Sequence, residues 1–117
     1  MKINPWQITG FTDAEGGFYC SILIKDNNKI KLEFKIVQKK HSQNILHEIK
    51  NYFNCGSVVI DNRKSDTLKY HVTSLSDIIN IIIPHFENFP CLTSKYLNYN
   101  HWKQIAFILK KIGRAHV

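Results

Sequence analysis

Residues 8–16 read ITGFTDAEG, a segment with helix-forming residues, two acids and a closing glycine. The preceding Asn4–Pro5 pair favours a helix start, because asparagine can accept a hydrogen bond from an unpaired backbone N–H and proline suits the first helical position. The two glycines at 16–17 favour its end, since glycine readily adopts the left-handed conformation that stops a helix. We therefore expect a helix over residues 5–15.

Two small residues, Gly10 and Ala14, lie four positions apart and so share one face of this helix. Small side chains on a helix face allow a second helix to approach closely, as an interface between paired helices requires. The alternative is that this face packs against the core of its own domain.

The predicted helix ends with two carboxylates, Asp13 and Glu15. They face the negative end of the helix dipole and repel each other, at a cost of some tenths to about 1 kcal/mol each. A cation opposite them would remove that cost, and an open site with few carboxylates suits Mg²⁺, which also accepts phosphate oxygens and water. The alternative is a pair of solvated acids at an exposed helix end.

An alternating pattern after the helix predicts two strands, over residues 18–25 and 30–38, joined by a turn at residues 26–28. The side chains of one face are expected to lie inward, and those of the other face outward. The inward residues are Phe18, Cys20, Ile22 and Ile24 in the first strand and Leu32, Phe34 and Ile36 in the second.

The rest of the chain adds a helix, a second hairpin and two further helices, in the order α-β-β-α-β-β-α-α. This order predicts an α+β fold, a four-stranded antiparallel sheet with helices on one face. The remaining predicted elements are a helix over 42–53, strands at 57–61 and 67–73, a helix from Ser74 closed by Pro84, and a last helix capped by Thr93 or Ser94.

The size and charge of the chain restrict the classes of function. Its 117 residues suffice for one domain with a modest core. A net charge of +7, from 16 Lys and Arg against 9 Asp and Glu, suits a polyanion such as duplex DNA; a basic surface without a partner is the alternative. A membrane is disfavoured, because no run approaches the roughly 18 apolar residues that span a bilayer. The first six residues lack the apolar stretch of a signal peptide.

The three cysteines are far apart and form no CxxC pair, so neither a zinc site nor a disulfide framework is expected. We expect reduced thiols in an intracellular compartment.

Residues 8–16 resemble the nine-residue signature of the LAGLIDADG homing endonucleases, with Gly10, Asp13, Ala14, Glu15 and Gly16 in register. Extended to NPWQITGFTDAEGGF, the segment is similar to the fungal and organellar branch of this family, which introns encode. The resemblance covers nearly all of residues 4–110. It implies a saddle-shaped sheet and a site-specific nuclease of intron homing, which hydrolyses double-stranded DNA with a divalent metal.

In this family the acid before the last glycine of the signature holds the metal, which implies that Glu15 binds Mg²⁺ or Mn²⁺. Asp13 and Gly16 would then support the signature helix. Gly10 and Ala14 would pack against a second copy of that helix.

The resemblance adds two residues near the metal. Gln38 matches a glutamine that positions water, and Lys95 matches a lysine that stabilises charge at the cleaved phosphate. For both, a polar surface residue without such a role is the alternative.

The resemblance also implies that the outward residues of the saddle enter the major groove of DNA, where base edges can be distinguished. The mixture of lysines with Glu, Ser and His fits base readout better than uniform phosphate binding. A solvated polar face is the alternative. The predicted residues are Tyr19, Ser21, Leu23, Lys25, Lys31, Glu33, Lys35, Lys69 and His71, to which Val59 and Asp61 can be added.

One signature implies one half-site, so the chain is expected to act as a homodimer or beside a second LAGLIDADG half. Alternative functions on the same fold are an RNA maturase that binds group I intron RNA, and a DNA- or RNA-binding unit without cleavage. Abundant Lys, Ile and Asn, which have AT-rich codons, indicate an organelle such as the mitochondrion. Residues 112–117, IGRAHV, resemble a translated sequencing adapter, so we expect a domain over residues 1–111 and a non-native tail after it.

Overall fold

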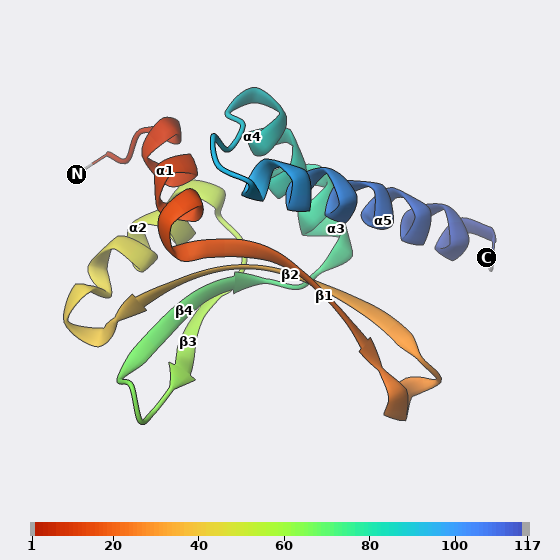
Figure 1. Ribbon diagram of the computed structural model, residues 1–117, viewed down its shortest axis with the longest axis horizontal. Helices are drawn as coiled ribbons and strands as arrows, with labels where there is room; N and C mark the ends of the chain where they lie inside the picture. The colour runs from red at the N-terminus through yellow and green to blue at the C-terminus, as the bar shows by residue number, and fades with distance from the viewer. Residues whose placement is uncertain (1, 116–117) are drawn as a thin grey trace.

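The computed structural model describes residues 2–115, and of Asp26, Arg114 and Ala115 it describes the backbone alone. The chain forms one antiparallel sheet that helices cover on one face (Figure 1). This confirms the predicted α+β class and the order of elements. The elements are α1 (Pro5–Glu15), β1 (Gly16–Leu23), η1 (Ile24–Asp26), β2 (Lys29–Lys39), η2 (Lys40–Ser42), α2 (Asn44–Phe53), β3 (Ser57–Asn62), β4 (Thr67–Val72), α3 (Leu75–Asp77), η3 (Ile78–Ile82), α4 (Ile83–Asn88) and α5 (Lys95–Ala115).

The strands lie in the order β1-β2-β4-β3, so β2 and β4 are central and β1 and β3 are the edges. Phe34 in β2 is paired with Phe18 on one side and with Val72 on the other. Figure 1 shows the sheet bending away from the helices at both of its hairpins. The face opposite the helices is therefore open along the whole sheet.

The start of α1 is fixed by two reciprocal hydrogen bonds, of which the sequence predicted the one that Asn4 accepts. The side chain of Asn4 accepts a hydrogen bond from the backbone N–H of Trp6 at 2.8 Å. In return the side-chain oxygen of Gln7 accepts from the backbone N–H of Asn4 at 2.7 Å. This arrangement satisfies two backbone donors that a helix start leaves without partners.

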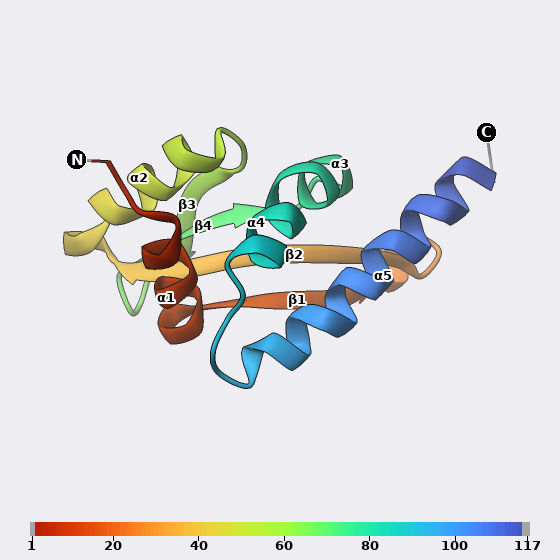
Figure 2. The same cartoon turned by 90° about the horizontal axis from the view of Figure 1, so that it is seen from above.

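The core lies between the helices and the inner face of the sheet. Leu32, Phe34 and Ile36 are all buried, which confirms the predicted alternation of β2. The ring of Phe18 packs within 5.5 Å, centroid to centroid, of four aromatic rings, those of Phe34, Phe86, Tyr99 and Trp102. Figure 2 shows why α5 contributes to this cluster, because that helix crosses over β1 and β2.

The outer half of β1 differs from the prediction. Cys20 and Ile22 were expected to lie inward, yet both are exposed. Ile24 and Lys25 lie in the short helical turn η1 and not in the strand, and Ile24 is 81% exposed. The reason is visible in Figure 1, where the β1–β2 hairpin extends away from the helical layer. The alternation predicts which side chains share a face of the strand, but that face is buried only where another element covers it.

The helix that begins at Ser74 also differs, since it does not close at Pro84 but continues to Asn88. Residues 78–82 form a π-helical turn just before the proline. Proline has no N–H to donate, so it fits the first turn of the α-helical segment that follows this break in the hydrogen-bond pattern.

The last helix, α5, extends to Ala115 and includes part of the predicted tail; residues 116–117 lie outside the described residues. Among the described residues, no helix combines the length and the apolar character that crossing a membrane requires.

Candidate active site and nucleic-acid interface

The signature helix meets the sheet at Gly16, where α1 passes directly into β1. A Cβ atom on Gly16 would lie 2.8 Å from the carbonyl oxygen of Lys35 and 3.0 Å from the Cα of Thr12. The backbone of Gly16 is extended, with φ −120°, so the predicted left-handed stop is wrong. Glycine is required here because the backbones of α1 and β2 approach too closely for a side chain.

Asp13 ties the foot of α1 to the segment that leads into α5. Its carboxylate accepts hydrogen bonds from the backbone N–H groups of Leu92 and Thr93, at 2.9 and 3.2 Å, and from the Thr93 hydroxyl at 2.6 Å. Burial raises the pKa of the Asp13 carboxyl, but these hydrogen bonds outweigh it, and the pKa lies below its usual value. Asp13 is thus an ionised acceptor whose bonds are already used within the domain.

Lys95 is the first residue of α5, and its side chain reaches the foot of α1. Its ammonium donates a hydrogen bond to the carbonyl oxygen of Thr12 at 3.0 Å. Its backbone N–H donates to the Thr93 hydroxyl, the same group that binds Asp13. Asp13 and Thr93 therefore hold the backbone from which Lys95 extends.

Glu15 is the last residue of α1, and its side chain is exposed. None of the ion pairs among the described residues involves it. The two acids of the signature thus differ in their surroundings: the carboxylate of Asp13 is engaged with the protein, while that of Glu15 faces solvent.

The surroundings of Glu15 offer few protein ligands to a cation. In the part of the chain that the structure describes, no three His, Cys, Asp or Glu side chains converge as a metal site. A cation at Glu15 would therefore need ligands other than a cluster of such side chains. Mg²⁺ is commonly held in this way, by one or two carboxylates together with waters and substrate phosphates. The donor set at the foot of α1 fits a Mg²⁺ ion shared with a nucleic-acid backbone.

Gln38 lies on β2, two residues beyond Ile36, which pairs with Gly16. It pairs with Leu68 and is half-buried on the same face of the strand as Ile36. The register therefore places Gln38 where β2 continues past the start of β1, toward the last turn of α1. The foot of α1 thus gathers Glu15, Gly16 and Lys95, with Gln38 on the adjoining stretch of β2.

The small-residue face of α1 is not covered by the domain itself. Gly10 and Ala14 are both exposed, and a Cβ atom on Gly10 would meet nothing within 4 Å. Trp6, one turn earlier on the same side, is 50% exposed. The described part of the chain leaves room here for a second helix.

The open face of the sheet carries a network of charged and aromatic side chains across all four strands. The Lys35 ammonium lies 4.8 Å from the centre of the Tyr19 ring and 3.9 Å from the Asp61 carboxylate. Glu33 binds both Lys69 and His71. These residues lie where the alternation predicted them. Of the other predicted members, Ser21 and Lys31 are exposed, Leu23 is half-buried, and Lys25 lies in η1 beyond the strand.

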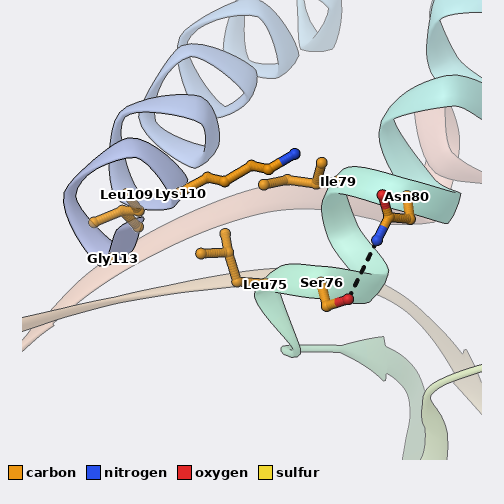
Figure 3. Close-up of a pocket in the computed structure, with 7 residues that line it drawn as sticks. All are labelled: Leu75, Ser76, Ile79, Asn80, Leu109, Lys110 and Gly113. Atoms are coloured by element: carbon orange, nitrogen blue, oxygen red, sulfur yellow. Dashed lines mark hydrogen bonds between the residues drawn. The ribbon is translucent and has the colours of Figure 1, made fainter. Parts of the chain in front are cut away.

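A cavity of about 350 Å³ lies elsewhere, between η3 and the end of α5 (Figure 3). Its wall is mostly apolar, and the Asn80 amide donates a hydrogen bond to the Ser76 hydroxyl within it. None of the predicted site residues lines it. The lining residues are Leu75, Ser76, Ile79, Asn80, Leu109, Lys110 and Gly113.

The sequence of the chain matches the family model of the LAGLIDADG endonucleases over residues 8–106. The chain belongs to the LAGLIDADG endonuclease family. A relative from Neurospora crassa, named probable intron-encoded endonuclease 2, is 38% identical over an alignment of 112 residues that covers 92% of this chain and 25% of that protein.

Solved LAGLIDADG structures share the fold. The meganuclease I-CpaMI, bound to uncleaved DNA, matches with a TM-score of 0.87 and 30% identity, over 95% of this chain and 38% of that one. The homing endonuclease I-TnaI matches with a TM-score of 0.84 and 25% identity, over 95% of this chain and 76% of that one. The predicted LAGLIDADG family and fold are confirmed. The chain spans about a quarter of the length of the curated relatives it first matches.

The role of Thr93 at this LAGLIDADG site was not predicted from the sequence. Thr93 was predicted only as a helix cap, yet its hydroxyl connects Asp13 to the backbone of Lys95. Asp13 lies 80 residues from Thr93 in sequence, so no local sequence pattern predicts this contact.

Proposed function

We propose that the chain is one half of a site-specific endonuclease that hydrolyses double-stranded DNA with Mg²⁺ or Mn²⁺ in the homing of a mitochondrial intron. The observation that carries this proposal is the exposed carboxylate of Glu15. It forms no ion pair with a described residue, and it ends a signature helix whose small-residue face the described part of the chain leaves uncovered. Membership of the LAGLIDADG family and the intron-encoded relatives support it.

DNA would bind to the open face of the sheet. A net charge of +7 favours association with a polyanion. The side chains of the network stand on a surface that no helix covers, so they can enter a major groove and contact base edges. The foot of α1 would then face the backbone to be cut.

At the foot of α1, three side chains would have different roles in catalysis. The Glu15 carboxylate would hold the divalent ion, which when bound lowers the pKa of water and neutralises charge on the cleaved phosphate. Lys95 would place a second positive charge at that phosphate, because Thr12 holds its ammonium at the same end of the helix. Gln38 would orient water from the adjoining strand.

The second half of the enzyme would come from another LAGLIDADG unit, either a second copy of this chain or another domain. Gly10 and Ala14 would form the contact, since their face of α1 is free. Two units paired in this way present two acidic helix ends, one for each strand of the duplex.

The test is cleavage of a plasmid that carries the parent gene's uninterrupted intron-insertion site, in the presence of Mg²⁺. We expect cutting by the chain and none by Glu15→Gln, whereas Glu48→Gln on α2 should retain full activity. Equal cutting by Glu15→Gln would overturn the assignment of Glu15. Stimulated splicing of the intron RNA without cutting would instead indicate an RNA maturase.

A further inference from the structure

The open face of the sheet carries two acids, Glu33 and Asp61, although a phosphate backbone repels negative charge. Their contacts differ. Asp61 lies 3.9 Å from Lys35, next to the irregularity in the pairing of β3 between Ile60 and Asn62. Glu33 lies on the central strand β2 and is bound more tightly.

A single oxygen of Glu33 binds two residues of the neighbouring strand β4. Its Oε2 accepts a hydrogen bond from the Lys69 ammonium at 2.8 Å and lies 3.0 Å from Nδ1 of His71. The side chains of Glu33 and Lys69 are each 20% exposed. Burial raises the pKa of Glu33, but Lys69 and His71 outweigh it and the pKa lies below its usual value, so the carboxylate is ionised.

The strand register shows how these side chains are arranged. His71 pairs directly with Lys35, while Lys69 pairs with Val37, farther along β2 from Glu33. Lys69 and Glu33 therefore reach toward each other along the strands, beside His71. The three side chains thus form one bonded unit on the open face of the sheet.

This unit has hydrogen-bonding capacity left over. A carboxylate has two oxygens, and the other one, Oε1, makes no hydrogen bond with a described residue. An ammonium has three N–H donors, of which Lys69 uses one here. The unit thus presents an acceptor beside donors. In the major groove, a G·C pair presents the complementary arrangement: the N4 donor of cytosine beside the O6 and N7 acceptors of guanine.

We propose that Glu33 and Lys69 read one G·C base pair in each half-site, with Glu33 accepting from cytosine and Lys69 donating to guanine. His71 is a positioning residue that holds the orientation of the Glu33 carboxylate. This inference rests on the proposed function, because it requires that DNA lies on this face.

The experiment is selection from a pool of double-stranded oligonucleotides with a randomised core, in metal-free buffer so that no strand is cut. Wild-type chain, Glu33→Gln, Lys69→Met and the matched control Glu48→Gln, which lies on α2 in the helical layer, are compared by sequencing the bound fraction. Far-ultraviolet circular dichroism checks that each variant folds.

We expect the wild type to enrich G·C at one position in each half-site, and Glu33→Gln and Lys69→Met each to lose about tenfold of that preference at the same position. Glu48→Gln should keep it. Unchanged base frequencies in Glu33→Gln, or the same loss in Glu48→Gln, would overturn the inference while DNA binding stands. A wild-type chain that retains no duplex would instead overturn the proposed function, and this inference with it.

Discussion

The ammonium of Lys95 lies 3.0 Å from the carbonyl oxygen of Thr12, in the last turn of the helix that ends at Glu15. A positive charge at this position interacts favourably with the negative end of the helix dipole. Lys95 and Glu15 reach the same end of α1 from segments far apart in sequence, and they form no ion pair with each other among the described contacts. Opposite charges that do not neutralise each other remain available to a substrate.

Replacing Lys95 with methionine should reduce the rate of strand cleavage by about 100-fold, because a preorganised donor near the developing charge is lost. The affinity for DNA should change little, since the chain has 16 basic residues. Single-turnover cleavage at saturating protein measures the effect. Lys103→Met is the matched control, because Lys103 is paired with Glu87 at 3.1 Å. Equal losses in both variants would count against a role for Lys95 at the phosphate.

Replacing Asp13 with asparagine should lower the free energy of unfolding by about 1–2 kcal/mol, because an ionised acceptor of three hydrogen bonds is lost. Cleavage should also fall, since the backbone that carries Lys95 is released. Urea unfolding measures the first effect. Asp66→Asn, at an exposed turn, is the control and should unfold as the wild type does.

The same carboxylate predicts a pH dependence. The pKa of Asp13 is lowered from 3.8, so its contribution to stability is present above that pH and is lost as the pH falls through the lowered value. Asp13→Asn should remove this part of the acid sensitivity. An unchanged profile in the variant would contradict the assignment.

His85 should make the fold sensitive to mild acid. It is buried between α1 and α2, where Nε2 lies 3.2 Å from the Thr9 hydroxyl and Nδ1 lies 3.3 Å from the Tyr52 hydroxyl. Burial lowers its pKa from 6.5 to about 4. The unfolded chain therefore binds a proton that the folded chain excludes, so stability is complete above pH 6.5 and declines by about 3 kcal/mol as the pH falls toward 4.

Thermal unfolding between pH 7 and pH 4 tests this prediction. His85→Gln should flatten the decline, although it is less stable at pH 7, whereas His47→Gln on the exposed side of α2 should leave the decline intact. A parallel decline in all three proteins would show that another group titrates.

Replacing Gly10 with leucine should leave the domain folded but prevent its pairing with a second signature helix. Nothing within 4 Å opposes a Cβ atom there, and the loss of a helical glycine can stabilise the isolated domain by up to about 1 kcal/mol. Pairing with a second signature helix should be blocked, so cleavage should be lost. Sedimentation measures the pairing, chemical unfolding measures the stability, and a cleavage assay measures the activity, all on one preparation. Gly16→Ala should instead lower the stability of the domain itself, because the new Cβ atom would lie 2.8 Å from the Lys35 carbonyl oxygen.

The sequence was sufficient where local rules decide the structure. The cap at Asn4 and the burial of Leu32, Phe34 and Ile36 follow from side-chain chemistry and strand periodicity, and both are as predicted. It was insufficient where a distant element decides. Ile22 alternates as an inward residue should, yet it is 62% exposed because its end of the hairpin bends away from the helical layer (Figure 1).

The candidate site divides in the same way. The signature supplies Glu15 and Gly16 from nine consecutive residues, which a sequence displays directly. The bonds of Asp13 to Thr93 and of Lys95 to Thr12 join segments about 80 residues apart, and only the folded chain reveals them. Whether Gln38 and Lys95 act in catalysis stays a prediction.

The two acids of the signature have different roles in the structure. The Asp13 carboxylate is hydrogen-bonded within the domain, whereas the Glu15 carboxylate faces solvent. Under the proposed function, a substitution at residue 15 would therefore remove cleavage and leave a domain that still folds. Such a variant would keep the sheet face on which DNA is proposed to bind, so cleavage could be lost while binding persists.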